Sequence, residues 1–355
     1  MSLIKNIVIK NFRGFKELKI EDINHINILV GNNNSGKSSV LEAFFLIMGM
    51  SNPLLPDNIN RIRGLKFKNA NDFKFLFHQL NLENTPKIEC TFNNEVKRSL
   101  TLEPIITKNT SSSNNIDEIE ASSAAPNING LNLKFSNKIK HSPNKSYKSS
   151  LIFNPPSELI PTFNNNYQEE YSAVLLSGNI SDDNALRRYS EILKHKKGNI
   201  VLKAIQKIDP KIINILPLKD GLYFDYEDIN ELVPVNLSGD GVRKFLNIVT
   251  TIAEKQNSFI LIDEIENGLH YSAHKGLWES IINISKEFNT QLFITSHNIE
   301  TLKCVKELLE ETKYIDYQQK ISIYKLAQTK KQGAKTYKYT FDGFKSAIDL
   351  NTEIR

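Results

Sequence analysis

Apolar and charged positions alternate along residues 3–20, with a turn at Gly14, and this two-residue period predicts a pair of β-strands. Residues 26–30 form a short β-branched apolar run, which suits a buried strand and is too short for a helix. Between residues 37 and 48 the apolar side chains instead recur with helical spacing. Residues 31–36 therefore link a buried strand to a helix.

The middle of the chain is more polar and less regular. Residues 88–92, 96–102 and 131–135 are strand-like, whereas 107–129 are rich in serine and asparagine and predict a mobile or partly disordered loop. Residues 137–150 are polar and lysine-rich. They predict a surface loop that is either solvated or in contact with a phosphate backbone.

Helical periodicity returns over residues 167–210, where Asp182 and Asp183 are candidate N-caps. Strands and helices then alternate, which predicts a mostly parallel sheet with helices on its faces. The predicted elements are a strand at 222–226, a helix from about Gly241, a strand at 259–262, a helix at 271–288, a strand at 292–295, a helix at 299–309, strands at 320–326 and 335–341, and a short last helix.

Composition narrows the class of protein without changing this picture. Of the 355 residues, 40% are hydrophobic and 24% charged, and the net charge of +5 is compatible with a nucleic-acid partner without requiring one. Cys90 and Cys304 form no CxxC pair, which argues against a disulfide framework and a structural zinc site. We find no signal-peptide pattern and no apolar run of about 18 residues, so we expect no membrane partner and a cytoplasmic location.

The strongest chemical motif is Gly31-Asn32-Asn33-Asn34-Ser35-Gly36-Lys37-Ser38, followed by Ser39, which fits the pattern G-x-x-x-x-G-K-[ST]. Glycines let the backbone curl so that its N–H groups face phosphate oxygens, and the following helix directs its positive end at the same anion. Lys37 can reach the β- and γ-phosphates, and Ser38 can bind Mg²⁺. A chance match arises in roughly one such chain in a hundred. Here the required strand and helix flank the loop, so the sequence predicts a nucleotide site.

Two carboxylates follow a second buried strand. The apolar run 259–262 ends in Asp263 and Glu264, at the edge where open α/β sheets bind ligands. Asp263 can hold Mg²⁺, and Glu264 can orient or deprotonate an attacking water. His297 follows the apolar strand 292–295 at the same edge. It could reach a γ-phosphate or that water, or it could be a structural histidine.

A turn of small residues, Leu237-Ser238-Gly239-Asp240-Gly241, precedes a helix whose apolar residues recur at helical spacing. The start of such a helix is a possible anion site. It can equally be an ordinary helix start that Asp240 caps. The local sequence leaves both interpretations open.

The order of these motifs resembles the ATPase heads of the ABC superfamily, most of all the branch with RecF, SMC heads and the OLD (overcoming lysogenization defect) nucleases. Asn11-Phe12-Arg13-Gly14-Phe15 and the phosphate-binding loop are typical openings of that branch, and Glu266-Asn267-Gly268-Leu269-His270 lies where it carries the D-loop. The chain also resembles small ATPases of bacterial anti-phage defence. The resemblance covers residues 1–50 and 220–310 well and the middle poorly.

This resemblance implies an α/β P-loop NTPase head of ABC-ATPase type, with a mostly parallel sheet flanked by helices, an N-terminal antiparallel β part and a short β/α insertion. We expect an N-terminal lobe at 1–90, the insertion at 91–215 and a C-terminal lobe at 216–355. ATP and Mg²⁺ are the implied ligands, with residues 31–39 binding the triphosphate and Arg13 near the nucleotide. The implied roles are Mg²⁺ binding for Ser38 and Asp263, catalysis for Lys37, Glu264 and His297, and binding of the other subunit's nucleotide for Ser238, Gly239 and Gly241.

Departures from the family pattern bear on the partners. The turn reads LSGDG, so Asp240 brings a carboxylate close to a phosphate site unless it caps the helix and faces away, and Gln79 is a weak candidate for the Q-loop residue. Only 58 residues follow His297, which is short for a Toprim nuclease domain. We therefore expect a homodimer or higher oligomer that controls a separate effector, a nuclease or toxin, in trans.

Two other function classes stay open. A RecF-like repair or recombination clamp would bind DNA directly, and the mild basicity and the lysine-rich middle favour it. A transporter ATPase would need a membrane partner, and the LSGDG turn and the NNNSGKSS loop fit that class poorly.

Overall fold

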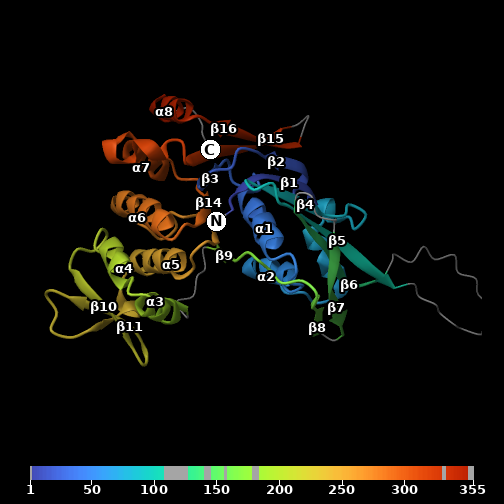
Figure 1. Ribbon diagram of the computed structural model, residues 1–355, viewed down its shortest axis with the longest axis horizontal. Helices are drawn as coiled ribbons and strands as arrows, with labels where there is room; N and C mark the ends of the chain where they lie inside the picture. Colours follow the sequence, from blue (N-terminus) through green and yellow to red (C-terminus); the bar gives the residue numbers. More distant parts are fainter. Residues whose placement is uncertain are drawn as a thin grey trace, which may run out of the picture. The chain divides into compact units, whose positions relative to one another are not determined.

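The computed structural model describes residues 2–107, 127–139, 145–155, 158–177, 184–329 and 333–350. These divide into two compact units (Figure 1). The first unit comprises residues 1–5, 21–45 and 171–355, and the second comprises 6–20 and 46–170. The boundaries 1–90, 91–215 and 216–355 that we expected differ from this division, because residues 171–215 pack into the first unit.

The first unit is built on a six-stranded sheet with the strand order β16-β15-β3-β14-β13-β9. All neighbouring strands are parallel except β15 and β16, which pair antiparallel. The mostly parallel sheet predicted from the sequence is therefore confirmed. Its strands are β3 (Ile26–Val30), β9 (Ala173–Leu176), β13 (Phe259–Ile262), β14 (Gln291–Thr295), β15 (Ile321–Thr329) and β16 (Gly333–Tyr339).

Helices cover both faces of this sheet, because the central strands are apolar on both sides. On one face, Phe44 of α1 lies against Phe293 of β14, with ring centroids 4.0 Å apart. On the other, apolar residues of α5, α6 and α7 join Ile28, Ile260 and Ile294 in one core. These helices are α1 (Lys37–Met48), α5 (Asp240–Glu254), α6 (His274–Glu287) and α7 (Ile299–Glu310), followed at the end of the chain by α8 (Phe341–Asp349).

The prediction of a helical segment at 167–210 is only partly correct. Residues 173–176 form β9, which pairs in parallel with β13 and brings this stretch into the main sheet. An apolar run of four residues is too short for its period to distinguish strand from helix. The candidate caps Asp182 and Asp183 lie outside the described residues. Beyond them the unit contains α3 (Ala185–Lys194), α4 (Gly198–Ile205) and a small sheet of β10 (Ile212–Leu218), β11 (Gly221–Tyr226) and β12 (Val233–Pro234).

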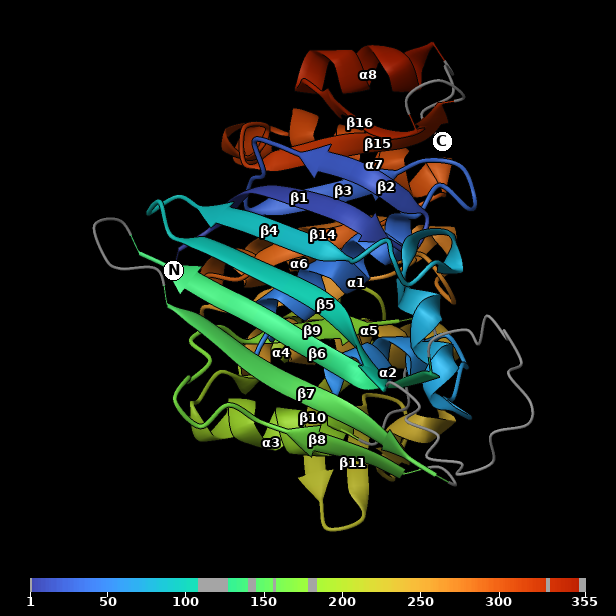
Figure 2. The same cartoon turned by 90° about the vertical axis from the view of Figure 1, so that its right-hand side faces the viewer.

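The second unit contains a seven-stranded sheet with the order β2-β1-β4-β5-β6-β7-β8 (Figure 2). Alternate side chains are buried, as β4 shows, so one face packs on the core and the other meets solvent. The strands are β1 (Ile4–Phe12), β2 (Phe15–Ile20), β4 (Lys87–Phe92), β5 (Lys97–Thr107), β6 (Asn127–Lys138), β7 (Ser146–Asn154) and β8 (Glu158–Thr162). The unit also holds α2 (Leu55–Ile62) and the 3-10 helices η1 (Ala70–Leu76) and η2 (His78–Leu80).

Both predicted loops of the middle region need correction. Residues 127–129 belong to β6, and 108–126, the rest of the serine-rich stretch, lie outside the described residues. Of residues 137–150, 137–138 are the end of β6 and 146–150 belong to β7, whereas 140–144 lie outside the described residues. The polar sequence concealed these strands because one face of an antiparallel sheet is solvated. Among the helices of the described ranges, none has the length and apolar character needed to cross a membrane.

Candidate nucleotide-binding site

The loop between β3 and α1 has the backbone of a phosphate-binding loop. Gly31, Asn34 and Gly36 have φ values of 146°, 69° and 97°, in the region that glycine adopts readily and asparagine tolerates. A Cβ at Gly31 would lie 2.5 Å from the backbone oxygen of Leu326, so the close approach of β15 requires glycine there. Helix α1 begins at Lys37. The unpaired N–H groups of its first turn give this loop a positive end.

The Lys37 ammonium is held against its own loop. Its Nζ donates hydrogen bonds to the backbone oxygens of Gly31, at 2.7 Å, and Asn32, at 3.0 Å. Burial lowers the pKa of Lys37, and the nearby Asp263, Glu264 and Glu266 carboxylates act in the opposite direction. The lysine is therefore mostly buried and lies in the field of three negative charges.

The other residues of the loop differ in exposure. Asn32, Asn33 and Asn34 are exposed at its tip, and Ser38 is half-buried. Ser35 and Ser39 are buried, and the Ser35 hydroxyl has no hydrogen-bond partner among the described residues. An exposed backbone tip next to a helix N-terminus is accessible to an anion.

Thr295 contacts both residues that follow β13. Its Oγ1 donates to Asp263 Oδ1 at 2.5 Å and accepts a hydrogen bond from the backbone N–H of Glu264 at 2.7 Å. Thr295 ends β14, which is the parallel neighbour of β13. Adjacent parallel strands thus bring Thr295 to the Asp263–Glu264 turn at one edge of the sheet.

The backbone and side chain of Glu264 are both constrained. Glu264 has a φ of 49°, which is uncommon for a residue other than glycine and typical of strained functional turns. The Asn267 amide donates a hydrogen bond to the Glu264 carboxylate. Lys244 of α5 donates to the Glu264 backbone oxygen at 2.9 Å, and burial lowers the pKa of that lysine. Glu264, whose carboxylate we expected to orient water, is thus held by Asn267 at that carboxylate and by Lys244 at its backbone oxygen.

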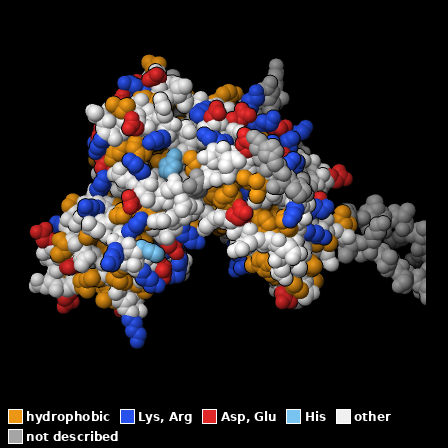
Figure 3. Space-filling view, viewed as in Figure 1, with side chains coloured by type: hydrophobic (Ala, Val, Ile, Leu, Met, Phe, Trp, Pro, Cys, Tyr) orange, Lys and Arg blue, Asp and Glu red, His pale blue; other side chains and the backbone are white. Residues whose placement is uncertain are grey.

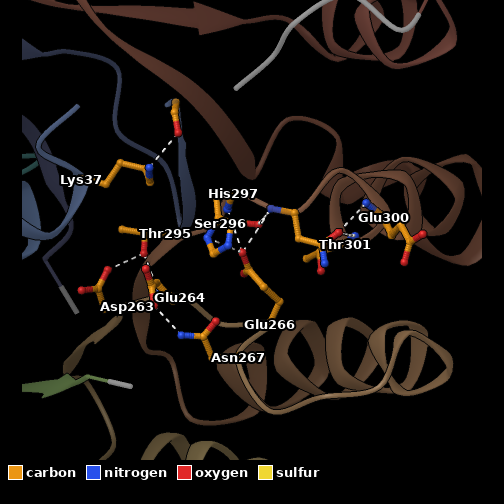
Figure 4. Close-up of polar contacts among 12 residues, drawn as sticks. Lys37, Asp263, Glu264, Glu266, Asn267, Thr295, Ser296, His297, Glu300 and Thr301 are labelled. Atoms are coloured by element: carbon orange, nitrogen blue, oxygen red, sulfur yellow. Dashed lines mark hydrogen bonds and ion pairs between the residues drawn. The ribbon is translucent and has the colours of Figure 1, made fainter. Parts of the chain in front are cut away.

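Glu266 holds the segment that carries His297. One of its carboxylate oxygens, Oε1, accepts hydrogen bonds from the backbone N–H groups of His297, at 2.8 Å, and Asn298, at 3.1 Å. The same oxygen lies 3.1 Å from Nδ1 of the His297 ring (Figure 4). The Glu266 side chain is buried and the His297 side chain is 39% exposed. The buried carboxylate therefore fixes the backbone from which the histidine projects.

The small-residue turn leads into α5, and the N-cap of this helix is one residue earlier than the Asp240 that we considered. Gly239 is the N-cap residue, and Asp240 is the first residue of the helix rather than its cap. Asp240 is exposed and forms an ion pair with Arg243, so its charge is partly compensated. The Ser238 hydroxyl is buried without a hydrogen-bond partner among the described residues, whereas Leu237 is 76% exposed.

Gly241 lies against the loop that contains Gly268 and Leu269. A Cβ at Gly241 would be 3.0 Å from the backbone oxygen of Gly268 and 3.5 Å from the Leu269 side chain. Gly268 has a φ of 75°, which glycine adopts without strain. The structure thus assigns Gly241 a packing role between α5 and this loop.

Arg13 and Gln79 belong to the second unit, and their predicted roles stay predictions. The Arg13 guanidinium donates to the backbone oxygen of Phe75 at 2.9 Å, and its backbone N–H donates to Leu76 at 3.0 Å. Gln79 is exposed and has a φ of 57°. Arg13 thus lies in the turn between β1 and β2, and Gln79 lies in η2.

The donor atoms at this site suit Mg²⁺. Asp263 and Ser38 offer carboxylate and hydroxyl oxygens, which this ion prefers over nitrogen or sulfur. In the part of the chain that the structure describes, no group of three His, Cys, Asp or Glu residues could form a metal cage. Magnesium usually needs no such cage, because one or two protein ligands share it with substrate phosphates and water.

Sequence reasoning missed three residues of the site. Thr295, Glu266 and Lys244 each stood in or beside a motif without an assigned role. Their partners are 20 to 32 residues away in the chain. For two of them, Thr295 and Glu266, the sequence did offer a signal, because each is a polar residue close to the end of a buried strand.

Comparisons with known proteins place the chain among nucleotide-dependent enzymes. Residues 26–303 match the family described as "AAA domain, putative AbiEii toxin, Type IV TA system". The "ATP/GTP phosphatase" of Helicobacter pylori is 28% identical over 352 residues, which cover 87% of this chain and 89% of that protein. The "Uncharacterized protein MJECL10" of Methanocaldococcus jannaschii is 54% identical over 46 residues, 13% of this chain and 21% of that protein.

Among solved structures, the SMC head domain from Thermotoga maritima aligns with 95% of this chain and 98% of its own, at 13% identity and a TM-score of 0.47. The family match spans the phosphate-binding loop, the Asp263–Glu264 turn and His297, and covers more than half of the chain. The chain therefore belongs to the family of AAA domains described as "AAA domain, putative AbiEii toxin, Type IV TA system" and is an ATPase of the P-loop type.

Proposed function

We propose that this chain hydrolyses ATP between two copies of itself and uses the resulting cycle of closing and opening to control a separate effector. The observation that supports it most is the constellation at the edge of the parallel sheet. There Thr295 fixes the Asp263 turn, Asn267 binds the Glu264 carboxylate, and Glu266 holds the His297 segment. This arrangement offers a held general base and a held hydrogen-bond donor, the two kinds of group that assist phosphoryl transfer.

The residues have separable roles in this proposal. The backbone N–H groups of residues 31–37 and the Lys37 ammonium bind the triphosphate. Glu264 accepts a proton from a water whose oxygen attacks the γ-phosphorus, the bond to the β-phosphate oxygen breaks, and ADP and phosphate leave. His297 donates a hydrogen bond to a γ-phosphate oxygen as charge builds there. Asp263 and Ser38 would hold Mg²⁺, which neutralises charge on the phosphate oxygens when it is bound.

Features of the turn at 237–241 support pairing of two copies. Leu237 is 76% exposed and Gly239 is exposed, so the start of α5 presents an apolar residue and free backbone N–H groups. A phosphate bound by a second copy would complement that helix end. The buried Ser238 hydroxyl has to rotate outward to take part. Hydrolysis would remove the shared γ-phosphate and release the pair, which is a ligand-driven shift in population.

The biological role rests on the comparisons and on the resemblance. The family description names a toxin of a type IV toxin–antitoxin system, and the Helicobacter pylori relative is named an ATP/GTP phosphatase. Small ATPases that resemble this chain belong to anti-phage defence modules. We therefore place the ATPase as the sensor or switch of such a module, with the toxic activity in a partner chain.

Replacing Glu264 with glutamine tests the mechanism. Glu264→Gln removes the base and keeps the shape, so ATP should bind without turnover and hold the closed pair. Size-exclusion chromatography with light scattering should show an ATP-dependent dimer, and phosphate release should fall by at least a hundredfold. Lys37→Ala is the matched control that loses the nucleotide and should show no ATP-dependent shift. If ATP does not change the elution of Glu264→Gln, the pairing model is refuted. If Glu264→Gln turns over ATP at the normal rate, Glu264 is not the base.

A further inference from the structure

The outer face of the seven-stranded sheet in the second unit carries lysines that face one another. The register pairs Lys97 of β5 with Lys138 of β6, and Lys134 of β6 with Lys148 of β7. Like charges directly opposite each other destabilise a sheet. Two such pairs on one open face therefore carry a cost to folding that an external anion would offset.

These lysines form two rows across the strands. One row contains Lys97 and Lys138, and the other contains Lys87, Lys134 and Lys148, joined through Thr101. On β5 the rows are four residues apart, from 97 to 101, and on β6 they are again four apart, from 134 to 138. At about 3.4 Å per residue the rows are separated by about 14 Å. Between them runs a row with the hydroxyls of Ser99, Ser136 and Ser146, which ends on β4 at Glu89, opposite Ser99.

The charge of this face is positive after its ion pairs are counted. Glu89 pairs with Lys87 and Glu103 pairs with Lys134. Across the described ranges, no carboxylate is recorded as an ion-pair partner of Lys97, Lys138 or Lys148, and all three are exposed. Elsewhere, in the view of Figure 3, basic and acidic side chains are interspersed. The face therefore has three lysine charges free to meet a polyanion.

The shape and composition of the face select among polyanions. Figure 2 looks onto it, and no helix of the unit crosses in front of β4 to β7. The outward positions of the described parts of β4, β5, β6 and β7 include no aromatic residue, because Phe92, Phe135, Tyr147 and Phe153 lie on the inward positions. Single-stranded nucleic acid is usually bound by stacking of bases on aromatic side chains. The face lacks that device and offers lysines and hydroxyls, with the Glu89 and Glu103 carboxylates paired to Lys87 and Lys134.

We propose that this face binds duplex DNA by its phosphate backbone, with the two lysine rows on the phosphates that flank one major groove. The separation of about 14 Å is close to the major-groove width of B-form DNA, about 12 Å, and lysine side chains are flexible enough to accommodate the difference. The major groove of A-form RNA is deep and narrow and fits the rows poorly. The hydroxyl row between them meets the groove, where serine donates to phosphates or bases. This binding is separate from ATP hydrolysis, which the proposed site performs with other residues.

The test compares two triple variants that each remove three positive charges. The first, Lys97→Gln, Lys138→Gln and Lys148→Gln, changes the face. The second, Lys66→Gln, Lys219→Gln and Lys303→Gln, changes exposed lysines elsewhere. Fluorescence anisotropy with a labelled duplex of about 25 base pairs is measured from 50 to 200 mM salt, with and without ATP. Single-stranded DNA and duplex RNA of the same sequence serve as competitors.

The face variant should bind the duplex at least tenfold more weakly at 100 mM salt, and the slope of log Kd against log salt should fall by about 2 to 3. Its melting temperature should equal or exceed that of the natural chain, because the opposed charges are gone. ATP hydrolysis without DNA should be unchanged in both variants. The proposal is overturned if the natural chain does not bind the duplex, if both variants weaken equally, or if RNA or single strands compete better than duplex DNA.

Discussion

The Glu266 carboxylate offers the sharpest test of how the fold serves the reaction. Its Oε1 accepts hydrogen bonds from two backbone N–H groups, those of His297 and Asn298, and lies close to the His297 ring. Glu266→Ala leaves the His297 N–H without its acceptor, whereas the Asn298 N–H keeps a hydrogen bond to Ser296 Oγ at 3.3 Å. A buried unpaired donor costs about 1–3 kcal/mol, and loss of one of two hydrogen bonds costs about 0.5–1.5 kcal/mol. The variant should therefore lose about 2–4 kcal/mol of unfolding free energy.

Activity should fall together with stability, because the His297 segment would no longer be fixed. We expect the turnover number to fall about 10- to 100-fold, the loss that a displaced catalytic group causes. Glu266→Gln keeps an oxygen at the same place and exchanges charged for neutral hydrogen bonds, so it should lose about 1–2 kcal/mol and less activity. The exposed Glu300, which lies in the first turn of α7, is the control; Glu300→Gln should stay within about 0.5 kcal/mol.

Chemical denaturation and phosphate release measure the two effects, and a double-mutant cycle separates them. If Glu266 acts through His297, then Glu266→Ala combined with His297→Ala should lose no more turnover than His297→Ala alone. Independent losses that multiply would refute the positioning role. Normal stability of Glu266→Ala would refute the reading of the hydrogen bonds themselves.

Two further predictions follow from buried charges. Burial lowers the pKa of Lys37, so its proton leaves at a lower pH than that of a free lysine. ATP affinity should therefore decline as the pH rises toward 10.5. Titration calorimetry should show this decline for the natural chain and a reduced or absent decline for Lys37→Arg. The unfolded chain binds this proton more tightly than the folded chain does. The Lys37 contribution to the free energy of unfolding should therefore increase with pH between the lowered pKa and 10.5. A decrease over that range would contradict the burial argument. The Arg98 guanidinium is fully buried and pairs with Glu169 at 2.6 Å, so Arg98→Ala should cost about 3–5 kcal/mol in denaturant melts. Replacing both partners, with Arg98→Met and Glu169→Gln, should cost clearly less; an equal cost would show that the lost packing, not the unpaired charge, matters.

Short-range features of the fold were accessible from the sequence. The strand, glycine loop and helix of residues 26–48 follow one another without a gap, and their periods and small residues determine them locally. Asp263 and Glu264 could be placed at the ligand-binding edge because any parallel strand followed by a helix ends there. The start of α5 was predicted within one residue, and the error about Asp240 arose because both Gly239 and Asp240 are acceptable N-caps.

Which residues meet across the fold was decided by tertiary structure alone. The contacts of Thr295 with Asp263 and of His297 with Glu266 join segments more than 30 residues apart, and no local period encodes them. β9 has only four residues, and it is a strand because it pairs with β13. The lysine rows likewise depend on the register of β5, β6 and β7, which packing of the inward face determines. Sequence determines the conformation of each element from neighbouring residues, whereas the partners across elements depend on how the whole core is packed.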